Sequence, residues 1–145
     1  MDDARDAALM VTYVIGAKKH SRRLKGGAAS IRKRVLQALY VAGQEIELDA
    51  EHSITDGSVS GKGHVPSAPG EPPNADTRLL DTSIETTVES RDPPTVAVTS
   101  NAPYSAALEF GTSKMAERPF MRPAAKRGRK KVVRGVARAA GLAYK

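Results

Sequence analysis

The chain has 145 residues, no Cys, three His and a net charge of +7. The lack of Cys excludes disulfides, thiolate metal sites and a Cys nucleophile, and three His in separate predicted segments disfavour a metal cluster. The apolar runs fall far short of the roughly 20 residues that cross a bilayer, and the start Met1-Asp2-Asp3 is unlike a signal peptide. We therefore expect a soluble, non-exported protein with no cofactor, no metal and no membrane contact.

Positive charge is concentrated at the C-terminal end of the chain. From Thr112 to Lys145 there are eleven Lys or Arg and a single acid, Glu117. The rest of the chain carries twelve basic and fifteen acidic side chains, a net charge of −3. This asymmetry predicts that the C-terminal segment faces an anionic partner, either nucleic acid or the acidic surface of another subunit.

The length fits one domain over residues 1–145 with a single modest core. Only 4% of the residues are aromatic and Trp is absent, so the core is expected to consist of Val, Leu, Ile and Ala. These side chains bury less area each than aromatic rings do. Such a core gives a marginal monomer, and we expect partner subunits to supply the missing burial.

The first predicted element is a strand from Val11 to Ile15, a β-branched and aromatic run that Gly16 closes. The basic stretch from Lys18 to Lys25 follows, and it is either a solvated helix or loop face or a nucleic-acid patch. Gly26-Gly27 is then expected to break the chain.

The longest predicted helix runs from an N-cap at Ser30 to about Glu51. Its apolar residues recur at helical spacing and predict a stripe that packs on a sheet. The stripe consists of Ile31, Val35, Leu39, Ala42 and Ile46. Gly43 lies on the same stripe and would let a neighbouring backbone come close.

A long loop, over about residues 53–77, is rich in Gly, Pro, Ser and Asp. Loops of more than about 15 residues in compact domains are usually functional or disordered. This loop is therefore either a flexible linker or an arm that becomes ordered on a partner. The run from Pro66 to Pro73 favours extended conformations, which suits an arm laid over a neighbouring subunit.

Two alternating segments, 83–90 and 95–100, predict a β-hairpin with Ile84 and Val88 on one side of its first strand. The four residues Arg91-Asp92-Pro93-Pro94 supply the turn, because Pro does not donate to a strand ladder. Asn101 is expected to cap a short helix that ends at Gly111.

A C-terminal helix is predicted with Pro123 in its first turn and Gly141 at its end. A helical wheel separates an apolar side from a basic side. The apolar side holds Val132, Val133, Val136, Ala139 and Ala140. The basic side holds Lys126, Arg127, Lys130, Lys131, Arg134 and Arg138. Together the elements predict an α+β fold, in which a small antiparallel sheet is packed by a long N-terminal helix and a C-terminal amphipathic helix.

Motifs for catalysis are missing from the sequence. It has no phosphate-binding Gly-rich loop, no GxSxG and no HExxH, its acids lack paired spacing, and Gly61-Lys62-Gly63 is too short for a P-loop. An enzyme such as a nuclease or a peptidase would need residues that only the fold gathers. We therefore expect that the protein is not an enzyme.

Four short motifs follow one another along the chain. They are Pro66-Ser67-Ala68-Pro69-Gly70-Glu71-Pro72-Pro73, then Asp76-Thr77 with Leu80 and Ser83-Ile84, then Asn101-Ala102-Pro103-Tyr104 with Leu108-Glu109-Phe110-Gly111-Thr112-Ser113, and Arg118-Pro119-Phe120-Met121-Arg122-Pro123. In this order the chain resembles the siphophage neck or tail-completion family, named for the tenth gene product of the lambdoid coliphage HK ninety-seven. The likeness covers nearly the whole chain, although each motif alone is weak. One departure is Arg78, because members often carry Gly directly after the Asp-Thr pair.

The resemblance implies a structural virion protein of the neck or proximal tail, assembled in the bacterial host cytoplasm and needing no cofactor. Its subunits would form a homo-oligomeric ring, a hexamer or a dodecamer, as a neck, tail-completion or tail-terminator component. Its other partners would be a head-completion or stopper protein and the tail tube or tail terminator protein. Packaged DNA would pass through the central channel without sequence-specific contacts.

Two segments are the expected intersubunit contacts, because one is rich in Pro and the other mixes aromatic, Met and Arg side chains, which are enriched at interfaces. The candidates are Pro66, Pro69, Pro72, Pro73, Phe110, Arg118, Phe120, Met121 and Arg122. Core packing of Phe110 and Phe120 is the alternative. The basic side of the C-terminal helix is the candidate for contacts with channel DNA or an acidic partner. An alternative function is a small basic DNA-binding protein that acts through this helix.

Overall fold

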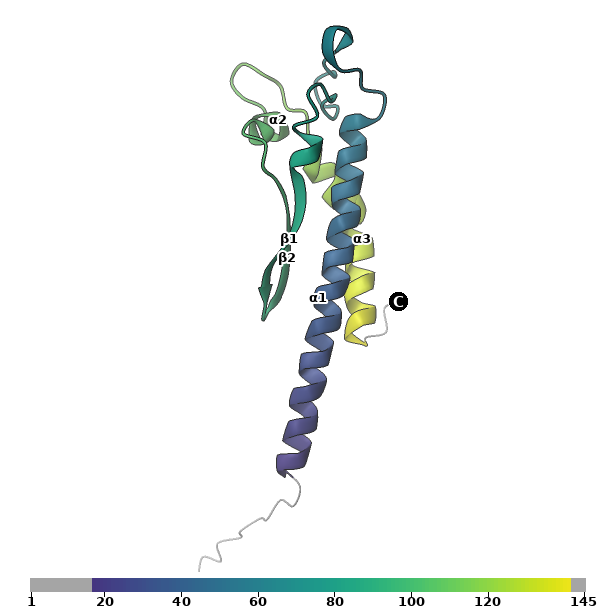
Figure 1. The fold of residues 1–145 in the computed structure, drawn as a ribbon, viewed down its shortest axis with the longest axis vertical. Helices are drawn as coiled ribbons and strands as arrows, with labels where there is room; N and C mark the ends of the chain where they lie inside the picture. The colour runs from purple at the N-terminus through teal and green to yellow at the C-terminus, as the bar shows by residue number, and fades with distance from the viewer. Residues whose placement is uncertain (1–16, 142–145) are drawn as a thin grey trace, which may run out of the picture.

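The computed structural model describes residues 17–141. Its helices and strands are α1 (Ala17–Thr55), β1 (Ile84–Arg91), β2 (Pro94–Ser100), α2 (Ser105–Phe110) and α3 (Met121–Ala140), with 3-10 turns at Gly61–Gly63 and Asp81–Ser83. The α+β class is confirmed, because a small antiparallel sheet stands beside a long N-terminal helix and a C-terminal helix (Figure 1). The strand predicted from Val11 to Ile15 lies outside the described residues.

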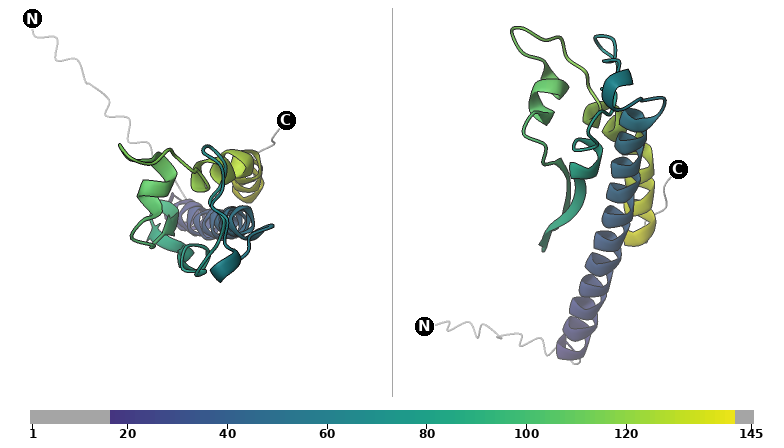
Figure 2. Two further views of the ribbon diagram at one scale, coloured as in Figure 1. Left: turned by 90° about the horizontal axis from the view of Figure 1, so that it is seen from above. Right: turned by 45° about the horizontal axis from the view of Figure 1, so that its top comes forward.

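The long helix α1 lies between the hairpin and α3 and contacts both. Seen from above in Figure 2, the hairpin and α3 stand on different sides of α1. The C-terminal end of α1 lies at the same end of the molecule as the loops and α2, whereas its N-terminal end extends past the hairpin tip and past α3. The two halves of α1 therefore have different surroundings.

Helix α1 begins at Ala17 and ends at Thr55, so the predicted start at Ser30 is wrong. The break expected at Gly26-Gly27 is also wrong, because the helix continues through both residues. A Gly inside a helix costs roughly 1 kcal/mol relative to Ala, which weakens a helix without removing a backbone hydrogen bond. The residues that flank this pair are mostly Lys, Arg, Leu and Ala, which favour helix.

The predicted stripe on α1 is only partly buried: Ala42 is buried and Ile31 is exposed. The close approach expected at Gly43 is present, although side chains of the hairpin make it and not a backbone. A Cβ at this position would lie 2.7 Å from Cγ2 of Thr86 and 3.3 Å from Cγ1 of Val96. The hairpin therefore sits closer to α1 than any residue larger than Gly would permit without a shift.

The hairpin pairs Ile84 with Ser100 at its base and Arg91 with Pro94 at its tip, so two residues connect the strands and not four. Ile84 is buried at the base, where the core lies. Val88 is exposed nearer the tip, because the hairpin there extends beyond the core. Ile84 and Val88 were predicted to share the buried side of β1, but only Ile84 is buried.

The core lies where the C-terminal part of α1 meets the loops, the base of the hairpin and the start of α3. It consists of Ala50, Ile54, Ala75, Leu80, Ile84, Ala102, Phe120 and Ala124. Half of these residues are Ala, so the core buries little apolar area per residue. The α1–α3 contact is also close, since a Cβ on Gly128 would lie 2.6 Å from Cγ1 of Ile46.

Both predicted helix ends are confirmed. Gly111 follows α2 with φ +72°, and Gly141 follows α3 in the left-handed conformation with φ +76°. The predicted cap at Asn101 is wrong, because α2 begins at Ser105 and the Asn101 side-chain amide donates to the Glu85 carboxylate instead.

Candidate interaction surfaces

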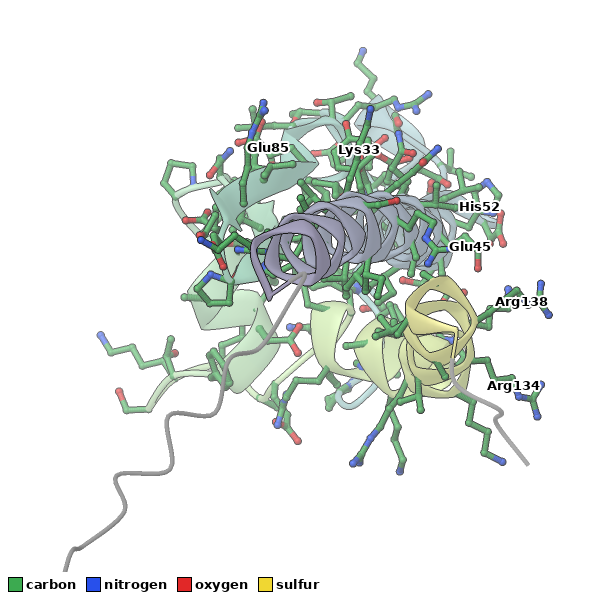
Figure 3. All side chains as sticks on the ribbon, turned by 90° about the horizontal axis from the view of Figure 1, so that it is seen from below. Lys33, Glu45, His52, Glu85, Arg134 and Arg138 are labelled. Atoms are coloured by element: carbon green, nitrogen blue, oxygen red, sulfur yellow. The ribbon has the colours of Figure 1, made fainter. Side chains whose placement is uncertain are left out.

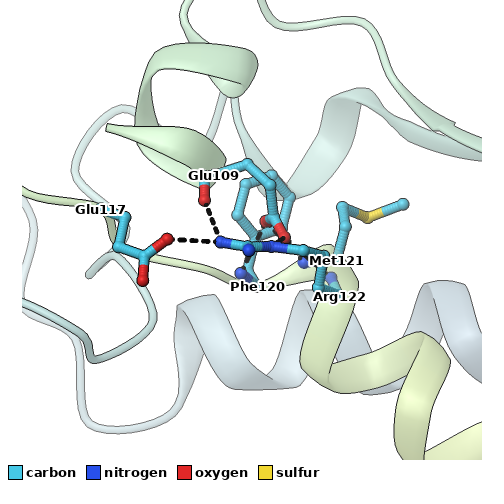
Figure 4. Close-up of polar contacts among 5 residues, drawn as sticks. All are labelled: Glu109, Glu117, Phe120, Met121 and Arg122. Carbon is cyan, nitrogen blue, oxygen red and sulfur yellow. Dashed lines mark hydrogen bonds and ion pairs between the residues drawn. The ribbon is translucent and has the colours of Figure 1, made fainter. Parts of the chain in front are cut away.

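The carboxylate of Glu109, on α2, caps the N-terminal end of α3 (Figure 4). Its Oε2 accepts hydrogen bonds from the backbone N–H of Phe120 at 2.8 Å and of Met121 at 3.0 Å. Its Oε1 accepts from the backbone N–H of Arg122 at 2.9 Å and from Nε of the same residue at 3.0 Å. The first N–H groups of a helix have no acceptor within it and favour a negative charge, so Glu109 joins α2 to α3.

The charged form of Glu109 is favoured although the side chain is only 5% exposed. Burial by itself raises the pKa of this carboxyl, but the N–H groups of Phe120, Arg122 and Met121 and the Arg122 guanidinium together bring the pKa below its ordinary value of 4.5. Glu109 is therefore ionised at neutral pH, and it has the partners that a buried carboxylate needs.

Arg122 completes this junction from the first turn of α3. Its guanidinium donates to Oε2 of Glu117 at 2.6 Å and to the Glu109 carbonyl oxygen at 2.7 Å, and it lies over the Phe110 ring, 5.1 Å from the centroid. The sequence prediction missed Glu109. The available signal was a lone acid inside Leu108-Glu109-Phe110-Gly111, placed before a helix whose first turn contains no acid.

The residues predicted as intersubunit contacts lie in different environments. Phe110 is 68% exposed, whereas Phe120 is 1% exposed and belongs to the core. The assignment of Phe120 to an intersubunit surface is therefore wrong, because its side chain is enclosed by its own subunit. Met121 is half-buried against the core, and Arg118 is half-buried with its Nε donating to the carbonyl oxygen of Ser67 at 3.1 Å. Arg122 remains half-exposed.

The proline-rich run is ordered against its own subunit. The backbone N–H of Gly70 donates to the Glu117 carbonyl at 2.9 Å, and the Asn74 side-chain amide donates to the Val65 carbonyl at 2.7 Å. The expectation that this segment is a linker or an arm ordered only by a partner is therefore wrong. Of its four prolines, Pro73 is buried and Pro72 is half-buried. Pro66 and Pro69 are exposed, so only they offer most of their surface to a partner.

A cavity of about 480 Å³ lies between the proline-rich run and α2, and Ser67, Asp81 and Tyr104 contribute to its lining. The hydroxyl of Ser67 and Oδ1 of Asp81 are buried without a hydrogen-bond partner among the described residues. Because both atoms are closed to solvent, they present no binding group to a ligand in the cavity. We therefore assign no ligand to this site.

Arg78, the residue that follows the Asp76-Thr77 pair, has an unusual backbone conformation. Arg78 has φ +63°, a value that Gly adopts without strain and that other residues rarely adopt. Its Nε donates to Oδ2 of the buried Asp81 at 3.0 Å. Arg78 therefore holds a left-handed backbone, and its guanidinium forms an ion pair with Asp81.

All six residues of the basic side of α3 are exposed. Two of them bind acids of α1 in the same subunit: Nε of Arg127 lies 2.7 Å from Oδ2 of Asp49, and Nζ of Lys131 lies 3.1 Å from Oε2 of Glu45. The other four make no ion pair within the described part of the chain, and we call them the outer basic face: Lys126, Lys130, Arg134 and Arg138. Figure 3 shows Arg134 and Arg138 pointing away from α1.

Among the side chains that the structure describes, no group of three or more acidic, His or Cys residues is placed to hold a metal ion. None of the described helices is both long and apolar enough to cross a membrane. Comparison with protein-family models, with curated proteins and with solved structures finds no match for this chain. The functional assignment therefore depends on the surfaces described above and on the motifs in the sequence.

Proposed function

We propose that the chain is a structural virion protein of a tailed bacteriophage, acting at the head–tail interface as a neck, tail-completion or tail-terminator subunit. The observation that carries this proposal is the Glu109 junction. Two motif segments on which the family resemblance depends, 108–113 and 118–123, bind each other through Glu109 and Arg122. These motif residues build a rigid connection between helices, which is the role expected of a structural subunit.

Exposed apolar side chains support assembly with further subunits. Val41 and Leu48, on α1, are 49% and 51% exposed, and Phe110 is 68% exposed. The hairpin and α3 cover the middle of α1 on two sides, but its N-terminal part extends past both of them. Burial of these side chains in neighbouring subunits would be favourable by roughly 25 cal/mol per Å² of apolar area.

In this proposal the subunits form a homo-oligomeric ring, a hexamer or a dodecamer, around the DNA channel. The ring contacts a head-completion or stopper protein on one side and the tail tube or tail terminator protein on the other. DNA passes through it without base-specific contacts, and no step of the proposed role is catalytic. Assembly takes place in the cytoplasm of the bacterial host, and the mature location is the virion.

Purification of the full chain tests the proposal. Size-exclusion chromatography with light scattering gives the mass of the particle, and negative-stain electron microscopy shows its shape. We expect a ring with a central opening. A chain that stays monomeric at micromolar concentration, alone and with tail tubes, contradicts the proposal.

The outer basic face favours one other candidate function, non-specific binding to duplex DNA. Its four cations are free to meet phosphates, and each phosphate neutralised makes affinity more dependent on salt. A gel-shift or fluorescence titration at several salt concentrations separates the two functions. Tight binding at physiological salt by a monomer, with a steep salt dependence, favours the DNA-binding protein. Weak binding by an assembled ring favours the neck subunit.

A further inference from the structure

Two acids of α1, Glu47 and Glu51, lie on the side of the helix that faces away from α3. Helix α3 packs on α1 through Glu45, Ile46 and Asp49. With 3.6 residues per turn, positions 47 and 51 are one turn apart and about half a turn around the helix from that contact. Leu48, 51% exposed, lies beside them, and both acids are half-buried. We call Glu47, Leu48 and Glu51 the acidic face.

Negative charge is crowded around this face. Burial, then the nearby carboxylates of Glu47 and Asp81, raises the pKa of Glu51 above its ordinary value, although the positive charges of His52 and Arg78 oppose this rise. Neither Glu47 nor Glu51 forms an ion pair with a side chain of residues 25–141. A cationic partner would therefore be favoured here, because it would relieve the repulsion among these acids.

The outer basic face of α3 has the complementary pattern. Lys126, Lys130 and Arg134 follow one another at intervals of one helical turn, and like charges at this spacing destabilise a helix. Val133, 42% exposed, lies among them. One face thus pairs cations with an exposed Val, and the other pairs acids with an exposed Leu. The one-turn spacing of Glu47 and Glu51 equals that of successive cations on α3.

The two faces cannot meet within one subunit. They lie on opposite sides of the α1–α3 pair, and the contact between these helices is already occupied by the pairs of Arg127 with Asp49 and of Lys131 with Glu45. Those two pairs show that α3 of this chain binds acids of α1 through its cations. Two different faces on one molecule make a head-to-tail contact, which repeats from subunit to subunit and closes into a ring if the rotation permits.

We propose that the outer basic face of α3 in one copy of the chain binds the acidic face of α1 in a second copy. Val133 packs beside Leu48, and the cations lie next to Glu47 and Glu51. The inference depends on the proposed homo-oligomeric ring and names the surfaces that form it. DNA phosphates are the competing partner for the basic face, but they leave the acidic face without a role.

Charge reversal on the full chain tests this contact. One variant carries Lys126→Glu, Lys130→Glu and Arg134→Glu, and the other carries Glu47→Lys and Glu51→Lys. Like charges across an interface cost several kcal/mol, so we expect each variant alone to associate at least about 100-fold more weakly than the natural chain. Mixing the two variants should restore particles in which they alternate, detected by light scattering and native mass spectrometry.

Matched controls reverse a charge elsewhere: Lys62→Glu in the 3-10 turn and Glu89→Lys on β1 should leave assembly unchanged. Circular dichroism checks that every variant keeps its helices. If a multiple variant unfolds, the single changes Lys130→Glu and Glu51→Lys give the same readout, with a smaller loss of association and recovery on mixing.

The outcomes separate the two proposals. A natural chain that never assembles contradicts the ring itself. A ring that persists in both reversed variants overturns the inference and leaves the ring intact. A basic-face variant that still assembles but no longer retains duplex DNA also overturns the inference, because it assigns the outer basic face to DNA.

Discussion

The two halves of α1 are one continuous helix, but they are stabilised differently. The C-terminal half is held by tertiary contacts: Ala50 and Ile54 are fully buried, and Gly43 lies directly under the hairpin. In the N-terminal half, Gly26 and Gly27 have open space around them, with no atom within 4 Å of a Cβ placed there. A helix in this chain therefore does not by itself indicate a core.

The N-terminal half of α1, which lacks core contacts, offers its surface to neighbouring subunits in the proposed ring. A helix end without tertiary contacts is stabilised only by its own hydrogen bonds and residue propensities, and such a helix is marginal in water. In the proposed ring, neighbouring subunits cover part of the exposed length of α1. Replacement of Gly by Ala should therefore have opposite effects in the two halves.

Phe120→Ala should have the largest effect, because Phe120 is the larger of the two biggest fully buried side chains at the core end. Removal of a buried Phe costs about 3 to 5 kcal/mol of unfolding free energy. Urea denaturation followed by circular dichroism measures the loss. Phe110→Ala is the matched control, since an exposed Phe should contribute little to monomer stability. Equal losses in both variants would contradict the core described here.

Glu109→Gln should destabilise the junction of α2 and α3 by about 1 to 3 kcal/mol, because it removes the charge that accepts four hydrogen bonds. The pKa of Glu109 is lower in the folded protein than its ordinary value of 4.5. Its contribution is therefore complete above that value and is lost as pH falls through the folded pKa.

Thermal unfolding between pH 7 and pH 3 tests whether the stabilisation by Glu109 is lost as the pH falls. The natural chain should lose stability in the acid range, and Glu109→Gln should show a smaller loss there. Glu89→Gln serves as control, because this acid is exposed on β1 and its carboxylate accepts a hydrogen bond only from Thr87 among the described residues. Identical pH profiles for the natural chain and Glu109→Gln would show that the carboxylate does not stabilise the α3 end.

Local patterns predicted the elements that depend on local chemistry. Alternation and the Asp-Pro-Pro segment indicated the hairpin, and Gly111 and Gly141 marked the ends of α2 and α3 correctly. The prediction of a break at Gly26-Gly27 was wrong, because it gave more weight to two Gly residues than to the helix-forming residues around them. That error removed thirteen residues, 17–29, from the predicted start of α1.

The surfaces were less predictable, because they depend on contacts between distant segments. Phe110 and Phe120 are the same residue type in similar motifs, yet one is exposed and the other is in the core. The proline-rich run is fixed by the bond from Arg118 to Ser67, 51 residues apart in the sequence. No local pattern reports such a bond. The basic side of α3 was predicted, but its internal pairs with Asp49 and Glu45 were not.

Gly43→Ala should destabilise the C-terminal half of α1. The new methyl group would lie 2.7 Å from Cγ2 of Thr86, so the hairpin has to shift. Overpacking of this kind costs about 1 to 3 kcal/mol, which exceeds the gain of about 1 kcal/mol from helix propensity. Chemical denaturation gives the difference. A stabilised Gly43→Ala chain would mean that the hairpin does not pack tightly on α1.

Gly26→Ala should have the smallest effect and the opposite sign. The position lies inside α1 with open space around it, so the substitution adds helix propensity without a clash. The expected gain is about 0.5 to 1 kcal/mol in local helix stability. Amide hydrogen exchange should show slower exchange in the N-terminal half of α1, while the denaturation midpoint of the core changes little because that half lacks core contacts. A large rise in the core midpoint would show that the two halves unfold as one unit, which contradicts their separate stabilisation.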